Sequence, residues 1–358
     1  MSNLNELKNG NYLTFDDVLL LPCYSEVVPK DVRLNTSLSL GLNLDIPILS
    51  APMDTVTEYN MLIALGNLGG MGVIHRNLSI ESQAEQLKKA LDFGVKAAAA
   101  VGVGSDFEGR VNTLAKLKPT AICIDSAHGH TKNILQAVKY IKQHHSTIPL
   151  IAGNVATYEG AKALFEAGVD IVKVGMGSGS ICTTRIMSGV GVPQLSAIND
   201  CVRAAREFNR TIIADGGIRT SGDIVKAIAA GASAVMVGSL IAGTDESVGD
   251  LVEFEEKKYK VYRGMGSLHS MEKGSATRYG QDYNLGDEQK LVPEGVEGLL
   301  LSRGSLKNCL YQILGGLRSG CGYVGAQDIQ SLQKNAKFIT ITSASNIESH
   351  PHTIFLKS

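Results

Sequence analysis

The sequence predicts a (β/α)8 barrel, because eight short apolar runs follow one another along the chain with helical segments between them. Each run is nearly continuous in apolar residues, which is typical of parallel strands that are covered on both faces. Most runs begin roughly 20 residues apart, the length that one strand and one helix occupy together. The eight predicted strands are residues 46–53, 71–75, 97–102, 121–126, 150–155, 171–175, 211–217 and 234–239.

Segments between the predicted strands have the spacing of amphipathic helices. Examples are residues 80–91, 157–167 and 222–230, and Ser221 followed by Asp223 marks a helix start. A doubly wound α/β sheet is the alternative fold, but it usually has fewer strands and a change of direction in the strand order. We therefore expect residues 1–358 to form a single barrel domain.

Two segments interrupt the regular spacing. A glycine-rich loop, residues 176–194, separates the sixth and seventh strands, and a polar excursion, residues 244–304, precedes a last helix at about residues 305–319. A long loop inside a compact fold is usually a lid or a binding element, although a disordered surface insertion is the alternative. The tail beyond Lys334 is polar.

The composition excludes several classes of protein. The chain has 19% charged and 44% hydrophobic residues and a net charge of −1, so a nucleic-acid partner is not expected. Residues 1–11 are polar, and no apolar run approaches the roughly 18 residues that a membrane helix needs. We expect a cytoplasmic protein with no membrane contact.

Six scattered cysteines never form a C-x-x-C pair, which argues against zinc and against a disulfide framework. Cys123 lies inside an apolar run and is expected in the core. The three histidines at positions 75, 128 and 130 could bind a metal, but no cysteine or carboxylate has matching spacing. The glycine-rich loop also lacks the spacing of a dinucleotide-binding fingerprint.

Cys182 is the strongest candidate for chemistry. It ends a turn with glycines at positions 175, 177 and 179, which allow the backbone to approach a ligand closely. Backbone N–H groups and the guanidinium of Arg185, three residues later, are expected to favour the thiolate, which is the nucleophilic form. The loop therefore indicates covalent catalysis.

The carboxyl ends of the predicted strands should form the site, as they do in barrels. These ends carry residues 50–53, His75, residues 125–126, Asn154, residues 215–217 and residues 238–239. Phosphate often binds after the seventh and eighth strands, where Ser180 and Ser239 could add hydroxyl donors; alternatively the glycines there only permit turns. Asp215 would accept hydrogen bonds from ribose, and Asp125 from a second nucleotide, unless each merely caps or forms a salt bridge.

Several motifs together resemble the inosine-5′-monophosphate (IMP) dehydrogenase family. They are Ser-Gly-Ser-Ile-Cys182-Thr-Thr-Arg, Asp215-Gly-Gly-Ile-Arg219, Tyr262-Arg-Gly-Met-Gly-Ser267, Glu294-Gly-Val-Glu-Gly298, and residues 13–20 and 53–58. The likeness covers essentially the whole chain in order. The family usually carries regulatory CBS modules after the second helix, whereas here residues 88–94 run straight into the third strand.

The resemblance implies that IMP is oxidised to xanthosine 5′-monophosphate with NAD, the committed step toward guanine nucleotides. Cys182 would attack C2 of the purine and form a thioimidate that water cleaves. Arg278 and Tyr279, on a mobile flap at residues 244–304, would activate that water, and Thr184 with Glu294 would give a second proton route. The implied substrate-binding residues are Ala51, Met53, Ser180, Asp215, Gly216, Gly217, Gly238, Ser239, Tyr262, Gly264, Met265, Gly266 and Glu294.

The resemblance also implies a cofactor side, a cation and an assembly. The implied NAD-binding residues are Asp125, Ser126, Ala127, Asn154, Gly175 and Gly177. The carbonyls of Gly177, Gly179 and Cys182 resemble a potassium site, which Glu348, Ser349 and His350 of a neighbouring subunit would complete. A homotetramer follows from that arrangement.

GMP reductase is the nearest alternative, because it shares the barrel, the cysteine and the Thr/Glu pair but reduces GMP with NADPH. Arg278 and Tyr279 favour the dehydrogenase, since a reductase hydrolyses no thioimidate. Ser178, Gly280 and His269 depart from the usual dehydrogenase pattern, which affects flap behaviour more than reaction type. A regulatory paralogue that only binds nucleotide is a third interpretation, disfavoured by the complete set of catalytic residues.

Overall fold

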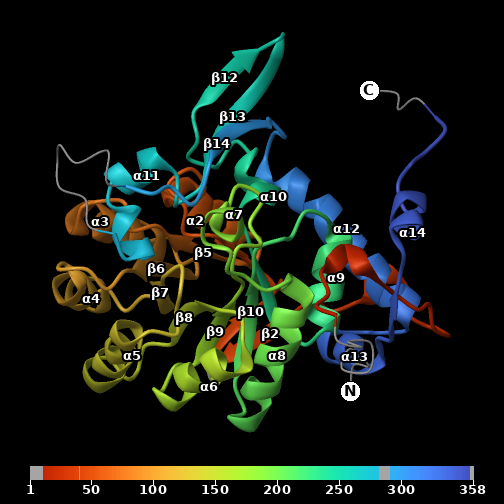
Figure 1. Ribbon diagram of the computed structural model, residues 1–358, viewed down its shortest axis with the longest axis horizontal. Helices are drawn as coiled ribbons and strands as arrows, with labels where there is room; N and C mark the ends of the chain where they lie inside the picture. Colours follow the sequence, from red (N-terminus) through yellow and green to blue (C-terminus); the bar gives the residue numbers. More distant parts are fainter. Residues whose placement is uncertain (1–10, 40, 282–290, 355–358) are drawn as a thin grey trace.

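The computed structural model describes residues 11–39, 41–281 and 291–354, and a closed barrel of eight parallel strands forms its centre (Figure 1). The strands are β4 (Ile48–Ser50), β5 (Met71–Ile74), β6 (Ala97–Val101), β7 (Ala121–Asp125), β8 (Leu150–Val155), β9 (Ile171–Val174), β10 (Thr211–Asp215) and β11 (Ala234–Val237). β11 pairs with β4 and closes the barrel. The predicted (β/α)8 fold is confirmed, and every predicted strand overlaps an observed one.

Helices surround the barrel, and α3, α4, α5, α6 and α8 are visible around it in Figure 1. The helices after the successive strands are α2 (Tyr59–Asn67), α3 (Ile80–Asp92), α4 (Phe107–Ala115), α5 (Lys132–His144), α6 (Tyr158–Glu166), α8 (Gln194–Glu207), α9 (Ser221–Ala229) and α12 (Leu306–Val324). Thr220 and Asp223 form a capping box that starts α9 at the predicted position. α12 extends five residues beyond the predicted end at residue 319.

Two apolar clusters explain why the strands read as continuous hydrophobic runs. Alternate residues of each strand point into the barrel, among them Leu49, Val73 and the predicted core cysteine Cys123. The other residues pack outward against the helices. Strands buried on both faces need apolar residues at every position. The hairpin of β2 (Thr36–Ser39) and β3 (Leu42–Leu44) adds Leu38 and Leu42 to the interior cluster.

The segment after β11 contains ordered elements in its described parts. They are α10 (Ser239–Ala242), β12 (Leu251–Phe254), β13 (Lys257–Arg263), α11 (Leu268–Glu272), the 3-10 helix η3 (Ser275–Tyr279) and β14 (Glu297–Leu301). β12, β13 and β14 form an antiparallel sheet that projects above the barrel in Figure 1. Residues 282–290 of the predicted flap lie outside the described residues.

The C-terminal tail is more structured than its polar composition suggests. It contains α13 (Ile329–Asn335), β15 (Phe338–Thr340) and α14 (Ser343–Glu348). β15 pairs antiparallel with β1 (Val18–Leu20), so backbone hydrogen bonds connect the N-terminal and C-terminal parts of the chain. Within the residues that the structure covers, no helix has the length and apolar character needed to span a membrane.

The β1–β15 pair gives a test of how the tail is held. We expect Phe338→Ala to lower the free energy of unfolding by about 3–5 kcal/mol, because Phe338 is only 3% exposed and its removal leaves a cavity. Ile339→Ala, on the same strand at a side chain 36% exposed, is the matched control and should cost far less. Urea denaturation compares the two variants, and equal losses would contradict the packing described here.

Candidate active site

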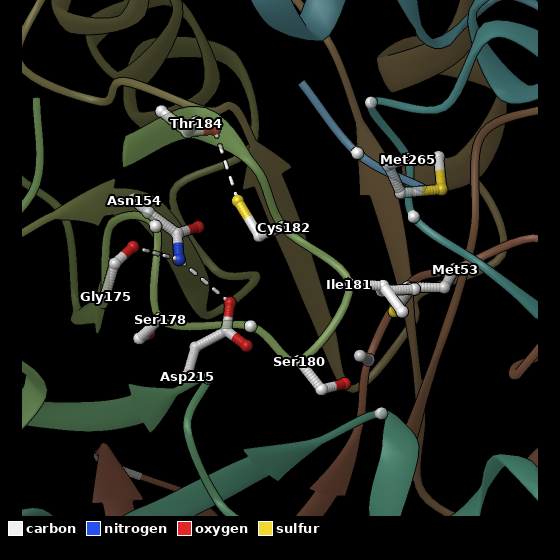
Figure 2. Close-up of a pocket in the computed structure, with 18 of the residues that line it drawn as sticks. Met53, Asn154, Gly175, Ser178, Ser180, Ile181, Cys182, Thr184, Asp215 and Met265 are labelled. Atoms are coloured by element: carbon white, nitrogen blue, oxygen red, sulfur yellow. Dashed lines mark hydrogen bonds between the residues drawn. The ribbon is translucent and has the colours of Figure 1, made fainter. Parts of the chain in front are cut away.

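One pocket at the carboxyl ends of the barrel strands collects nearly all the predicted site residues (Figure 2). The predicted residues that line it are Ala51, Met53, Asp125, Ala127, Asn154, Gly175, Gly177, Gly179, Ser180, Cys182, Thr184, Asp215, Gly216, Gly217, Gly238, Ser239, Tyr262, Gly264, Met265, Gly266, Arg278, Tyr279 and Glu294. They come from strand ends, from the glycine-rich loop and from the segment after β11.

Four predicted residues do not line this pocket. Ser126 follows β7, where its hydroxyl donates to the carbonyl of His128 at 3.2 Å. Glu348, Ser349 and His350 end α14, which packs beside the 3-10 helix η1 (Phe15–Asp17) of the same chain. Within one chain, these three tail residues are therefore not brought to the glycine-rich loop.

Cys182 faces the pocket from the loop between β9 and the short helix α7 (Thr184–Ser188). Its Sγ donates a hydrogen bond to Thr184 Oγ1 at 3.2 Å, as Figure 2 shows. The backbone of the loop pairs with a distant segment, because Thr183 N donates to Glu294 O at 2.9 Å and Cys182 bridges Gly295. The thiol and Glu294 are thus held in one wall of the pocket.

Arg185 connects separate parts of the glycine-rich loop that carries Cys182. Its guanidinium donates to the carbonyl of Met176 at 3.1 Å and to that of Val192 at 2.5 Å. These hydrogen bonds join the two ends of the glycine-rich loop. Arg185 therefore shapes the loop that carries Cys182, and its expected effect on the thiolate stays a prediction.

Two glycines lie where other groups approach the backbone closely. A Cβ on Gly175 would lie 1.9 Å from the carbonyl oxygen of Asp215. The ends of β9 and β10 could therefore not lie this close together if residue 175 had a side chain. A Cβ on Gly238 would lie 2.9 Å from the Tyr262 hydroxyl and 3.1 Å from Met53 Sδ. These contacts favour close approach over simple turn formation as the reason for glycine at these two positions.

Tyr262 supplies a buried phenol beside Gly238. Burial raises the pKa of Tyr262, and the hydrogen bonds to Ser180 and Ser239 act in the opposite direction. The phenol is therefore protonated at neutral pH and can donate a hydrogen bond. With Ser180 and Ser239 it forms a wall of hydroxyl groups on one side of the pocket.

Lys173 is the charged residue that sequence reasoning missed. It lies on β9 with no exposed surface, and its Nζ donates to Asp125 Oδ1 at 2.9 Å and to Asp215 Oδ2 at 2.7 Å. It also donates to Asn154 Oδ1. The available signal was a lysine within an otherwise apolar strand, because a buried lysine needs charged or polar partners.

Asn154 and Asp215 are joined within this network. Asn154 Nδ2 donates to Asp215 Oδ2 and to the carbonyl of Gly175, both at 2.9 Å (Figure 2). The amide of Asn154 therefore has a protein partner on its nitrogen and, through Lys173, on its oxygen. The ends of β7, β8, β9 and β10 are tied together by these side chains.

Arg278 and Tyr279 reach the pocket from η3. The Arg278 guanidinium forms an ion pair with Asp125. The backbone carbonyl of Arg278 accepts a hydrogen bond from Ala127 N at 3.1 Å. Burial raises the pKa of Tyr279. Arg76 lies nearby, and burial together with the charge of Arg278 lowers its pKa to about 10. Two predicted cofactor-side residues, Asp125 and Ala127, are thus in contact with η3.

His75, one of the three histidines considered as metal ligands, has a protein partner. His75 Nε2 lies 3.0 Å from Glu58 Oε1. The described ranges contain no group of three or more His, Cys, Asp or Glu side chains that could hold a metal ion. All six cysteines are free thiols.

The chain matches the family model described as "IMP dehydrogenase / GMP reductase domain" over residues 12–352. It is 39% identical to inosine-5′-monophosphate dehydrogenase of Staphylococcus saprophyticus, with 96% of both chains covered. The Streptococcus pyogenes dehydrogenase is also 39% identical, over 97% of this chain and 96% of its own.

The alignments are longer than the chain itself. The first spans 469 positions against a chain of 358 residues, so over a hundred positions are present only in the relative. Residues 93–96 alone connect α3 to β6, which leaves no room for the family's inserted modules at that point. The matches cover almost the entire chain, which therefore belongs to the IMP dehydrogenase/GMP reductase family.

Proposed function

We propose that this chain oxidises IMP to xanthosine 5′-monophosphate with NAD, through a covalent bond between Cys182 and the purine. The observation that carries the proposal is the position of Cys182, in one pocket that also contains the hydroxyl groups of Ser180, Ser239 and Tyr262 and the Asp125–Arg278 pair. The names of the two relatives support the same reaction.

The nucleotide would lie across the hydroxyl-lined wall. Ser180, Ser239 and the protonated Tyr262 can donate to a phosphate, and Gly217 and Gly238 leave room for it. The carboxylate of Asp215 can accept from ribose hydroxyls, since that side chain lies at the pocket surface. Met265 and Gly266 would contact the base, and Ala51, Met53, Gly216 and Gly264 would complete the lining.

The covalent step would begin with attack of the Cys182 thiolate on C2 of the hypoxanthine ring. The C–S bond forms as the hydrogen on C2 departs with its electron pair, which leaves a thioimidate on Cys182. Water then adds to C2, the C–S bond breaks, and the thiol is regenerated. Thr184, 3.2 Å from the sulfur, orients the thiol, and Thr184 and Glu294 offer a route for the proton lost by water.

The residues on the cofactor side fit a dinucleotide. Asp125 presents an acceptor for ribose hydroxyls, and Ser126, Ala127, Asn154, Gly175 and Gly177 lie at the same strand ends. Two buried donors of Arg76, Nε and Nη2, have no protein partner among the described residues and suit a negatively charged group such as a pyrophosphate. NAD, when bound there, supplies the acceptor for the hydride.

Arg278 and Tyr279 would activate the water in the second half of the reaction. Arg278 is 14% exposed and contacts Asp125, so η3 occupies part of the cofactor side in this arrangement. This role requires a desolvated, preorganised pocket around the guanidinium. We propose that residues 244–304 move as a flap on a single catalytic domain, residues 1–358, with residues 176–194 as its catalytic loop.

The same loop suits a potassium ion. The carbonyl oxygens of Gly177, Gly179 and Cys182 are hard donors, of the kind that a hard cation prefers. We propose that Glu348, Ser349 and His350 of a neighbouring subunit complete the site, because the same residues of this chain lie beside η1 instead. A homotetramer would bring these two elements together.

GMP reductase remains the second candidate, because the family includes both enzymes. Arg278 in contact with Asp125 and Tyr279 at the pocket wall favour the dehydrogenase, since only that reaction needs an activated water.

The reaction is tested by following nicotinamide absorbance with IMP plus NAD and with GMP plus NADPH, each with and without potassium. We expect NADH from the first pair, and Cys182→Ala should abolish it while IMP still binds, because only the nucleophile is lost. Cys23→Ala, at a cysteine outside the pocket, is the control with normal turnover. NADH formation by Cys182→Ala would reject the covalent mechanism, and turnover of GMP alone would select the reductase.

The role of Arg278 is tested by rapid mixing of Arg278→Ala with IMP and NAD. We expect a burst of one NADH per site at nearly the normal rate, followed by steady turnover slowed about 100-fold or more, the usual effect of losing a general base. Arg206→Ala, on the exposed face of α8, serves as the control. Loss of the burst itself would show that Arg278 acts before the hydrolytic step.

A further inference from the structure

The buried lysine at the base of the pocket contacts residues from both proposed subsites. Its three hydrogen-bond donors reach Asp125, Asn154 and Asp215, at the ends of β7, β8 and β10. An ammonium group has three donors and no acceptor, so these partners satisfy it completely. Lys173 itself has no exposed surface and does not line the pocket.

The two carboxylates face different ligands in the proposed function. Asp215 lies on the side assigned to IMP, and Asp125 lies on the side assigned to NAD, where it also contacts Arg278. Lys173 joins one oxygen of each, Asp215 Oδ2 and Asp125 Oδ1. The orientation of each carboxylate therefore depends on the same ammonium.

The charges explain why one lysine affects both sides. Lys173 compensates one of the two negative charges, and the Arg278 guanidinium compensates the other in this structure. A buried carboxylate that loses its cation is strongly disfavoured and takes up a proton or turns away. A change at one carboxylate therefore alters how much of the ammonium's charge is available to the other.

We propose that Lys173 is a positioning residue that couples the substrate and cofactor subsites by holding Asp215 and Asp125 on a single buried ammonium. The proposal rests on the proposed function for the identity of the ligands. Lys173 acts through the two carboxylates and Asn154, with no contact to a reacting atom. Removal of Lys173 weakens the binding of both IMP and NAD. A change to one carboxylate alters the affinity for the ligand in the other subsite.

The first experiment measures IMP affinity by equilibrium dialysis in the absence of NAD. IMP is a ligand in both the dehydrogenase and the reductase reactions, so the result does not depend on which one occurs. We expect Asp125→Asn to weaken IMP binding by about threefold or more, because the loss of one of its two anionic partners displaces the Lys173 ammonium and with it the Asp215 carboxylate that it holds. An unchanged IMP affinity in Asp125→Asn would overturn the coupling.

The second experiment replaces the lysine. We expect Lys173→Gln to raise the dissociation constant of IMP and the KM for NAD together, each by about tenfold, because hydrogen bonds to a charged group are lost on both sides. Lys173→Arg keeps the charge and should recover part of both effects. Lys142→Gln, at a partly buried lysine of α5 that donates to Asp170 Oδ2 at 2.9 Å outside the pocket, is the matched control and should change neither constant.

The outcomes separate the two proposals. If the wild-type chain forms no NADH from IMP and NAD, the proposed function fails, and the dialysis measurements still test the coupling. If the wild-type chain is active but Lys173→Gln changes only one constant, the coupling fails alone. If Lys173→Gln does not fold, the Asp125→Asn measurement decides, since that variant keeps the ammonium with two of its partners.

Discussion

The pairing of one buried ammonium with two carboxylates and an amide is the interaction on which the site depends. Lys173 has no access to water, so its charge is tolerated only while these partners surround it. The same contacts set the ends of β7, β8 and β10 relative to β9. Two residues after Lys173, Gly175 begins the loop that carries Cys182, so the position of the thiol follows from how these strand ends meet.

Segments far apart in the chain complete the pocket around that base. The Cys182 loop pairs with residues 294–296, and β13 is anchored by the ion pair between Arg263 and Asp54 at 3.1 Å. Asp54 also accepts from the hydroxyl of Ser270, within α11, at 3.0 Å. The contacts of Asp54 therefore attach β13 and α11 to the barrel. Farther along the same segment, Arg278 of η3 contacts Asp125 at the end of β7. This arrangement joins the nucleophile and the proposed water-activating residues in a single cavity.

The barrel and most of the pocket could be predicted from the sequence, because strands buried on both faces leave a distinct apolar pattern and barrels place their sites at strand ends. Lys173 was missed because residues 171–175 are otherwise apolar or glycine, and the segment was interpreted as a buried strand without a functional side chain. The carbonyl partners of Arg185 could not be predicted, because closeness in sequence to Cys182 does not show which groups a long side chain reaches. β15 could not be predicted from its polar surroundings, since its pairing with β1 joins residues more than 300 positions apart.

The most direct test of the account is peptide mapping of protein quenched with acid during turnover of IMP and NAD. The account predicts that the peptide containing Cys182 gains the mass of a purine nucleotide, and that no other cysteine peptide does. NADH release without any nucleotide on Cys182 at any quench time would contradict it.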